Sequence, residues 1–403
     1  MRIGLLAPPW IPIPPPAYGG IERVVALQAA GLAAAGHQVT LVAAPGSAVP
    51  GVEVVSPLES VPAQIGLATD EWRHVLGGLD ALSGADMVID HSGPLGALLS
   101  AQGSVPSLHV MHGSLEGVLL ELYNGLAARA PGLRLAAISR SQRLAAAHLP
   151  FAGVCHNAVD VAQAPFRANP DGYLAFLGRM APEKGVAEAI TLARAAGRPL
   201  IIAAKCREPA ERAYFEYAVK PHLGHGVELV GELGREASFE LLSRASALLF
   251  PISWREPFGM VLIEAMACGT PVLATNRGAV PEIVRDGVTG FVRDTPAELV
   301  ELVDRIDELD RAVCRSHVAE HFSSEAMARS YARLLVAVPR PRVPALASPM
   351  VFSAPTPSAR WPKTSFETSP FETSPFGASQ PETSPHQTAP ARRTRRPAGR
   401  GAR

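Results

Sequence analysis

The chain has 403 residues, of which 47% are hydrophobic and 18% charged, a composition typical of a globular protein with large cores. Its 37 basic residues equal its 37 acidic residues, which excludes a general attraction to nucleic acid or to an anionic membrane, so any anion site must be local. Four scattered cysteines without a C-x-x-C pair argue against a disulfide framework and a zinc site, and they fit a reducing cytosol.

The first half of the chain alternates short apolar runs with longer amphipathic stretches. Strands are predicted at residues 2–7, 38–43, 87–90, 107–111 and 135–138. Each is apolar throughout, as a strand covered on both faces must be. A helix predicted at 21–35 follows the first strand and is stopped by Gly36. This alternation predicts a doubly wound parallel sheet.

The pattern pauses and then restarts in the second half. Residues 157–160 and a stretch rich in Pro, Asn, Asp and Gly at 161–172 interrupt it. Further strands are predicted at 173–177, 199–203, 227–230, 247–250 and 271–274. The chain is therefore expected to form two Rossmann-like domains facing a cleft, with the ligand site at the carboxyl ends of the strands.

These patterns predict domain boundaries. The N-terminal domain is placed at 1–160, a linker at 161–172 and the C-terminal domain at 173–321. A last helix at about 322–337 is expected to pack back on the first domain. Residues 339–403 are rich in Pro, Ser and Thr and end in an arginine cluster, which predicts a disordered tail, either dispensable or a docking or phosphorylation segment.

The N-terminus gives an expectation about location. Its apolar stretch is too short, and too soon broken by prolines, for a signal peptide. No apolar run reaches the roughly 18 residues of a membrane helix. We expect a cytoplasmic protein without a transmembrane segment, and peripheral membrane contact stays open.

The first motif is a pair of glycines, Gly19 and Gly20, directly before the first predicted helix. Glycines there let backbone N–H groups approach an anion, and the helix dipole favours negative charge. A simple tight turn would need the same residues, so this motif predicts little by itself.

The second motif places two cations, Arg179 and Lys184, in the loop after the first strand of the second domain. A guanidinium and an ammonium group together make a good clamp for a diphosphate. The alternative is two solvated loop cations.

The third motif spans residues 250–271 and carries Glu256 and Glu264. Pro257 predicts a helix start, which would separate the two carboxylates by about 12 Å along the helix axis. Gly259 leaves the backbone uncovered near that end. Because the neighbours of Glu264 are apolar, its charge would need a partner; the alternative is a solvent-facing glutamate.

These motifs resemble those of the family-4 retaining glycosyltransferases of the GT-B fold. Residues 250–274 are similar to the E-x7-E signature, 177–185 to the G-R-x4-K-G loop, 19–23 to the glycine loop and 157–160 to the N-G-V-D hinge. The hinge departs from the pattern at Ala158, where glycine is usual. The resemblance covers roughly residues 1–337, and it implies that domain 1–160 is the acceptor side and that domain 173–321 binds the nucleotide sugar.

The resemblance implies roles for single residues. Arg179 and Lys184 would hold the donor diphosphate, with Gly19 and Gly20 closing over it. Glu264 would bind the ribose hydroxyls, and Glu256 the donor sugar. The backbone N–H groups of Phe258 and Gly259 would lie beside the sugar, His112 near the reacting carbon, and the 231–233 turn near the base.

The resemblance also implies the reaction. A sugar would move from a nucleotide sugar, with UDP favoured, to a small-molecule, glycan or lipid-linked acceptor with retention of configuration. No cofactor or metal is expected, because the chain lacks a D-x-D motif and the cations could replace a metal. The alternatives are a sugar-nucleotide epimerase or phosphorylase on this fold, or a non-catalytic scaffold.

Overall fold

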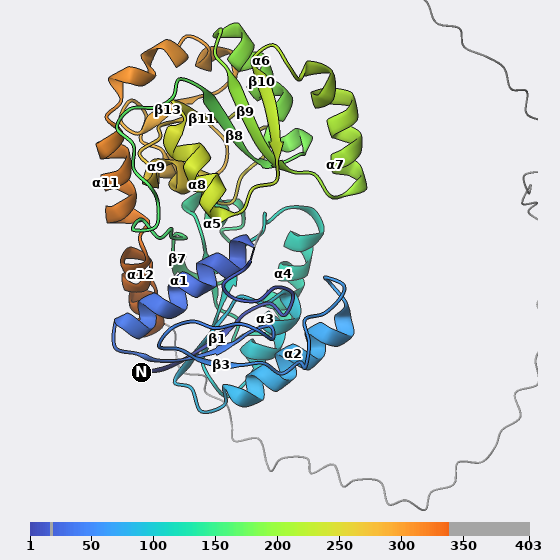
Figure 1. Ribbon diagram of the computed structural model, residues 1–403. Helices are drawn as coiled ribbons and strands as arrows, with labels where there is room; N and C mark the ends of the chain where they lie inside the picture. Colours follow the sequence, from blue (N-terminus) through green and yellow to red (C-terminus); the bar gives the residue numbers. More distant parts are fainter. Residues whose placement is uncertain (17–18, 338–403) are drawn as a thin grey trace, which may run out of the picture. The chain divides into compact units, whose positions relative to one another are not determined.

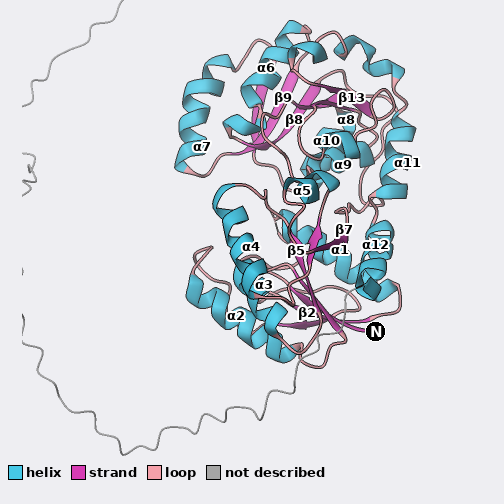
Figure 2. Cartoon of the chain, turned by 180° about the vertical axis from the view of Figure 1, so that it is seen from behind, coloured by secondary structure: helices cyan, strands magenta, loops and turns pink. Residues whose placement is uncertain are grey.

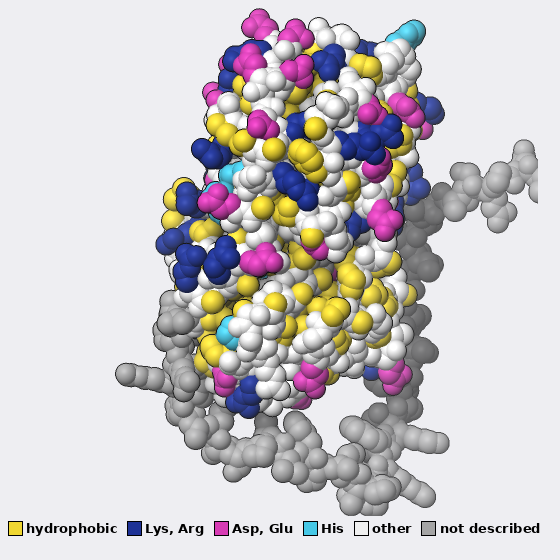
Figure 3. Space-filling view, turned by 60° about the vertical axis from the view of Figure 1, so that its left-hand side comes forward, with side chains coloured by type: hydrophobic (Ala, Val, Ile, Leu, Met, Phe, Trp, Pro, Cys, Tyr) yellow, Lys and Arg dark blue, Asp and Glu magenta, His cyan; other side chains and the backbone are white. Residues whose placement is uncertain are grey.

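The computed structural model describes residues 1–16 and 19–337 (Figure 1). The predicted tail, 339–403, lies outside these residues. Within them, no helix has the length and apolar character needed to cross a membrane. Basic and acidic side chains are interspersed over much of the face drawn in Figure 3.

The N-terminal lobe contains a seven-stranded parallel sheet in the order β3-β2-β1-β4-β5-β6-β7. Its strands are β1 (Arg2–Leu6), β2 (Gln38–Val42), β3 (Glu53–Val55), β4 (Met87–Asp90), β5 (Ser107–Met111), β6 (Leu135–Ala137) and β7 (Phe151–Val154). Its helices are α1 (Gly20–Ala34), α2 (Ala68–Ala81), α3 (Pro94–Gln102), α4 (Gly117–Arg129) and α5 (Arg140–Ala145).

Neighbouring residues of β1 show why these strands are apolar on both faces. Leu5 belongs to the core cluster that contains Leu32 of α1, whereas Leu6 belongs to the cluster that contains Val75 of α2. Both leucines are fully buried. Since successive side chains of a strand point to opposite faces, helices must cover both faces of this sheet, as Figures 1 and 2 show.

The C-terminal lobe contains a six-stranded parallel sheet in the order β10-β9-β8-β11-β12-β13. Its strands are β8 (Leu174–Arg179), β9 (Leu200–Lys205), β10 (Val227–Gly231), β11 (Ala247–Phe250), β12 (Val272–Thr275) and β13 (Gly290–Arg293). Its helices are α6 (Val186–Ala195), α7 (Pro209–Tyr214), α8 (Arg235–Arg244), α9 (Met260–Ala267), α10 (Val280–Ile283) and α11 (Arg311–His321), and a last helix, α12 (Ser324–Ala337), follows them in the chain. The predicted fold class, two doubly wound parallel sheets, is confirmed.

Three strands escaped the sequence prediction: β3, β7 and β13. All three lie at sheet edges, where one side of the strand has no neighbour. Their residues are accordingly half-exposed or mixed in burial, so they lack the continuous apolar run by which the central strands were predicted.

The chain crosses between the lobes twice, between β7 and β8 and again between α11 and α12. α11 packs on α9 of the C-terminal lobe, whereas α12 packs on α1 and β7 of the N-terminal lobe. The backbone N–H of Val159 in the first crossing donates to the carbonyl of Phe322 in the second, at 2.9 Å. The boundaries at 160 and 173 stay predictions; both fall in the segment between β7 and β8.

Candidate functional site

A cavity of about 280 Å³ lies at the carboxyl ends of the C-terminal strands. It is lined by residues that follow β8, β9, β10 and β11 and by the start of α1. Seven residues predicted from the motifs line it together: Gly19, Gly20, Arg179, Lys184, Glu256, Gly259 and Glu264. His112 and Phe258 are not among the residues that line it. The motifs of both lobes therefore meet at one place.

The segment from Arg179, at the end of β8, to Lys184 is held close to the residues that follow β11. Gly185 ends the loop with a φ of 77°, and a Cβ there would lie 2.2 Å from the carbonyl oxygen of Pro251. Only glycine allows both this left-handed backbone and this close approach. In addition, the backbone N–H of Ser253 donates to the carbonyl of Glu183 at 3.1 Å. The second motif, which carries Arg179 and Lys184, and the third motif are thus packed directly on each other.

Lys184 and Glu256 form an ion pair inside the cavity. Lys184 Nζ lies 2.6 Å from Glu256 Oε2, and the side chains are only 15% and 11% exposed. The ammonium group also lies over the ring of Trp254, 4.4 Å from its centroid. Screening by water is weak at such a site, so both charges act strongly on any ligand there.

The helix of the third motif begins later than predicted. α9 starts at Met260 rather than Pro257, and its N-cap Gly259 has φ 86° and ψ 69°. The predicted start was wrong because a residue in the left-handed region cannot continue a right-handed helix. Glu256 consequently lies in the loop before α9, Glu264 lies in its second turn, and the predicted separation along one helix axis does not apply.

Glu264 is the second carboxylate of the cavity, with a side chain only 14% exposed. Its Oε1 lies 3.6 Å from Nη1 of Arg23, which comes from α1 of the other lobe. Burial raises the pKa of Glu264, and the charges of Arg23 and Arg235 oppose that rise without cancelling it. A carboxylate held in this way favours ligand groups that can donate hydrogen bonds, such as hydroxyls.

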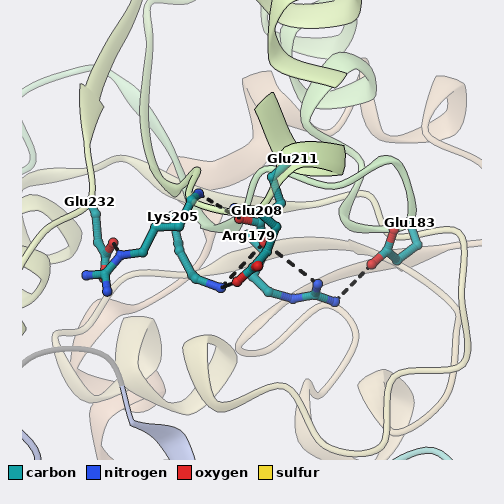
Figure 4. A network of polar contacts seen from close by, with 7 residues as sticks. Arg179, Glu183, Lys205, Glu208, Glu211 and Glu232 are labelled. Atoms are coloured by element: carbon teal, nitrogen blue, oxygen red, sulfur yellow. Dashed lines mark hydrogen bonds and ion pairs between the residues drawn. The ribbon is translucent and has the colours of Figure 1, made fainter. Parts of the chain in front are cut away.

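Arg179 is engaged by carboxylates in this structure (Figure 4). Its Nη2 lies 2.9 Å from Glu183 Oε1, and its Nη1 lies 3.9 Å from Glu211 Oε1. The side chain of Arg179 is 37% exposed, so it can reach a ligand in the cavity that it lines.

His112 lies at the end of β5 in a buried polar chain of the N-terminal lobe. Its Nε2 lies 2.9 Å from His91 Nδ1, and His91 Nε2 lies 2.5 Å from Gln28 Oε1. If His91 donates to the amide oxygen, its other nitrogen must accept from His112. Burial and the nearby His109 lower the pKa of His112 to about 3, so its imidazole is neutral at physiological pH.

Phe258 serves the packing of the crossing segments. Its side chain is 2% exposed and lies with its ring centroid 6.0 Å from His156 and 6.1 Å from Phe322. Ala158, which replaces the glycine usual in the hinge, is fully buried in the same region of the chain. The role predicted for Phe258 is through its backbone and stays a prediction, while its side chain contributes to packing.

A second cavity, of about 540 Å³, lies elsewhere in the C-terminal lobe. Ser246 and Pro271, which line it, precede β11 and β12, so it is at the amino ends of these strands, away from the usual ligand edge. Arg311 also lines this cavity, and its guanidinium group already donates hydrogen bonds to backbone carbonyls and to Thr270. In the described part of the chain, no group of three or more His, Cys, Asp or Glu side chains could hold a metal ion.

Two protein-family models match the chain. The model described as Glycosyltransferase Family 4 matches residues 18–163, and the model described as Glycosyl transferases group 1 matches residues 162–328. Between them they include every strand of the two sheets except β1, and every residue that lines the first cavity. The chain belongs to the family 4 glycosyltransferases.

Relatives of this glycosyltransferase agree with the assignment. A glycogen synthase of Mycobacterium tuberculosis is 31% identical over 214 residues, which cover 47% of this chain and 51% of that protein. The matches to the first curated relatives span only about a quarter to a half of those proteins, 28% and 51% of their lengths.

Solved structures match the glycosyltransferase over most of its length. One involved in avilamycin A biosynthesis is 26% identical, has a TM-score of 0.64, and is matched over 84% of this chain and 98% of that one. The Anabaena protein HepE, solved in complex with UDP-glucose, is 18% identical with a TM-score of 0.62, over 83% and 99%. The second likeness shows the GT-B fold alone.

The structure adds residues of the glycosyltransferase that the sequence prediction missed. Arg23, Lys205 and Ser238 also line the cavity. Arg23 is the last residue of the glycine-loop motif, and Lys205 is the last residue of β9. A basic residue at the end of a motif or strand is therefore the signal that could have indicated both. Ser238 lies on α8 and carries no comparable signal.

Proposed function

We propose that this glycosyltransferase moves a sugar from a nucleoside diphosphate sugar to an acceptor, with retention of configuration at the transferred sugar. One observation carries the proposal: Arg179, Lys184, Glu256 and Glu264 line a single cavity together with the N-terminus of α1. Cations and a helix N-terminus suit a diphosphate, and the carboxylates suit the hydroxyls of ribose and sugar.

The charges of the cavity match the charges of the reaction. Breaking a sugar–phosphate bond leaves negative charge on the diphosphate and positive character on the sugar ring. Arg179 and Lys184 would neutralise the leaving group, and Glu256, which is 2.6 Å from Lys184, would lie near the sugar. Fixed charges that act on developing charge lower the barrier, because they need no reorganisation during the step.

The remaining roles follow the same logic. Glu264 would accept hydrogen bonds from the ribose hydroxyls, and the backbone of Phe258 and Gly259 would donate toward the sugar. His112 is neutral at physiological pH, so it would act near the reacting carbon as a hydrogen-bonding group and not as a cation. It would reach the donor when the N-terminal lobe closes over the cavity.

UDP-sugars are the proposed donors, and no metal or cofactor is proposed. The complex of Anabaena HepE with UDP-glucose supports a UDP-sugar on this fold. Arg179 and Lys184 would supply the neutralisation that a divalent ion supplies in other sugar transferases. The acceptor would bind against the N-terminal lobe in a cytoplasmic protein, and small sugars, glycans and lipid-linked sugars are the classes to screen.

A thermal-shift screen with UDP, GDP and ADP and their glucose conjugates tests the proposal. A ligand present at a hundred times its Kd raises the unfolding free energy by about 2.7 kcal/mol, so the melting temperature should rise by a few degrees with at least one of them. No shift with any of the six compounds would contradict the proposal.

Turnover separates the rival reactions on this fold. Conversion of a stabilising nucleotide sugar into its epimer without acceptor would indicate an epimerase. Release of a sugar phosphate from a glycan by inorganic phosphate would indicate a phosphorylase. Formation of the free nucleoside diphosphate only when an acceptor is present would support the transferase, and binding without any turnover would favour a scaffold.

A further inference from the structure

Glu211 is a buried carboxylate next to the cavity that the proposed function does not use. It belongs to α7, and its side chain is only 5% exposed. Its Oε2 accepts hydrogen bonds from the backbone N–H groups of Arg207 at 2.8 Å and Glu208 at 3.1 Å. Its Oε1 is buried and has no hydrogen-bond partner among the residues that the structure describes. A carboxylate in such a place depends on neighbouring positive charge.

Two cations from adjacent strand ends provide that charge. Glu211 Oε1 lies 3.6 Å from Lys205 Nζ and 3.9 Å from Arg179 Nη1 (Figure 4). β8 and β9 pair in parallel with Arg179 directly beside Lys205, so both side chains leave the sheet at the same edge. One carboxylate oxygen is therefore shared by two cations, both of which also line the cavity.

Glu211 remains ionised in this arrangement. Burial raises its pKa, but the two backbone N–H donors and the charges of Lys205 and Arg179 outweigh burial, so the pKa lies below its ordinary value. A permanently charged, buried group cannot lose all of its cationic partners without a large penalty.

Donor binding requires Arg179 to change partners. In this structure Arg179 contacts Glu183 and Glu211, whereas the proposed function places its guanidinium on the diphosphate. Glu183 is 36% exposed, so water can solvate it after Arg179 leaves. Glu211 is buried, and water cannot replace Arg179 there to the same extent.

We propose that Lys205 is a positioning residue that keeps Glu211 paired while Arg179 turns from the carboxylates to the donor diphosphate. The inference rests on the proposed function. Lys205 acts through Glu211, and direct contact of its ammonium with a phosphate is the rival role. The two roles differ in one consequence: only the first disappears when Glu211 loses its charge.

A double-mutant cycle with UDP as the probe tests this inference. Isothermal titration would give the Kd of UDP for the full chain and for Lys205→Met, Glu211→Gln and the double variant. Lys205→Met should weaken UDP binding at least tenfold, because Arg179 is then held by Glu211. Glu211→Gln should tighten binding up to threefold, and the double variant should return to within threefold of the unmodified chain.

Two controls isolate the effect. Lys220→Met removes another lysine–glutamate pair of the same lobe, which is exposed, and should leave the Kd of UDP unchanged. Uridine carries no diphosphate, so its Kd should not respond to Lys205→Met. Melting curves without ligand establish that each variant is folded, and Lys205→Gln replaces Lys205→Met if the latter is not.

Three results would overturn the inference. A Lys205→Met Kd within threefold of the unmodified chain would show that Lys205 is not needed. A double variant as weak as Lys205→Met would assign Lys205 to direct phosphate contact. An equal loss for uridine would indicate a general distortion of the site. If the unmodified chain bound none of UDP, GDP and ADP, the proposed function itself would fail, which is a distinct outcome.

Discussion

Lys184 is the residue whose surroundings tie it most directly to the donor phosphates. Its side chain is 15% exposed, and its ammonium group pairs with Glu256 and lies over Trp254, so the position of the ammonium group is fixed from two sides. Lys184→Met should keep the aliphatic packing and remove the charge. We expect kcat/KM to fall by about 100-fold or more, as when one preorganised donor to a developing anion is removed.

The measurement is a steady-state assay with the nucleotide sugar identified by the thermal-shift screen. Lys220→Met, whose lysine is exposed and pairs with Glu216, is the matched control and should retain full activity. Activity of Lys184→Met within threefold of the unmodified chain, in a protein that melts normally, would remove Lys184 from the site.

The pair His91 and His112 predicts a loss of stability in acid. Burial lowers the pKa of both histidines, to about 3 for His112 and well below the ordinary value of 6.5 for His91. The folded chain keeps them neutral, whereas the unfolded chain takes up protons below pH 6.5. Their contribution is therefore complete above pH 6.5 and is lost progressively as the pH falls toward 3.

Urea unfolding at pH 7 and pH 5.5 measures this loss. Each of the two histidines should lower the free energy of unfolding by about 1 kcal/mol over that interval. His112→Gln should reduce the pH dependence by one histidine's share. His148→Gln removes an exposed histidine and should leave the dependence as it was. An identical pH dependence in His112→Gln would show that His112 is accessible to protons in the folded chain.

At the level of the elements, one arginine of α11 holds the first crossing segment against the helix that carries Glu264. Arg315 Nη1 donates to the carbonyls of Ala164 at 2.7 Å and Ala267 at 2.6 Å, and its Nη2 donates to that of Val161 at 2.7 Å. Val161 and Ala164 belong to the segment between the lobes, and Ala267 ends α9.

Arg315→Met should therefore destabilise the fold by about 2–3 kcal/mol, because it leaves carbonyls without their charged donor. The midpoint of urea unfolding measures the change. Arg305→Met, at an exposed pair with Glu308, is the control and should not shift the midpoint. An unshifted midpoint for Arg315→Met as well would mean that water satisfies these carbonyls.

Burial decided which elements could be predicted from the sequence. Central strands such as β4 and β11 are buried at every position, so an apolar run marked them with correct bounds. The edge strand β13 has one side without a neighbour and no such run. The start of α9 was misplaced because the left-handed backbone of Gly259 overrode the preference of Pro257 for a first helical turn.

The residues of the site also divide into those that the sequence predicts and those that it does not. Lys184, Glu256 and Glu264 lie in local motifs, and local motifs can be read from one sequence. The contact of Arg23 with Glu264 joins residues far apart in the chain, and that of Lys205 with Glu211 joins the end of β9 to the helix that follows it. They depend on how α1, β9 and α7 pack, which the pattern of apolar residues alone does not specify.

At the scale of the whole described chain, the site is divided between two lobes, and the chain passes from one to the other twice. Gly19, Gly20 and Arg23 come from the N-terminal lobe, and the other residues that line the cavity come from the C-terminal lobe. The Val159–Phe322 backbone hydrogen bond ties the two crossings to each other. Glu282 of the C-terminal lobe accepts hydrogen bonds from the backbone N–H groups of Arg140 and Ser141 in the N-terminal lobe.

This arrangement predicts closure on donor binding. A diphosphate held by Arg179 and Lys184 presents negative charge to the N-terminus of α1, which attracts it through backbone N–H groups and the helix dipole. The free energy of that contact is gained only if the lobes approach, so the bound chain should favour a more closed form. Small-angle scattering should show a smaller radius of gyration with saturating UDP than without ligand. Saturating uridine, which lacks the charge that bridges the lobes, should leave the profile unchanged, and identical profiles with UDP and without ligand would contradict closure.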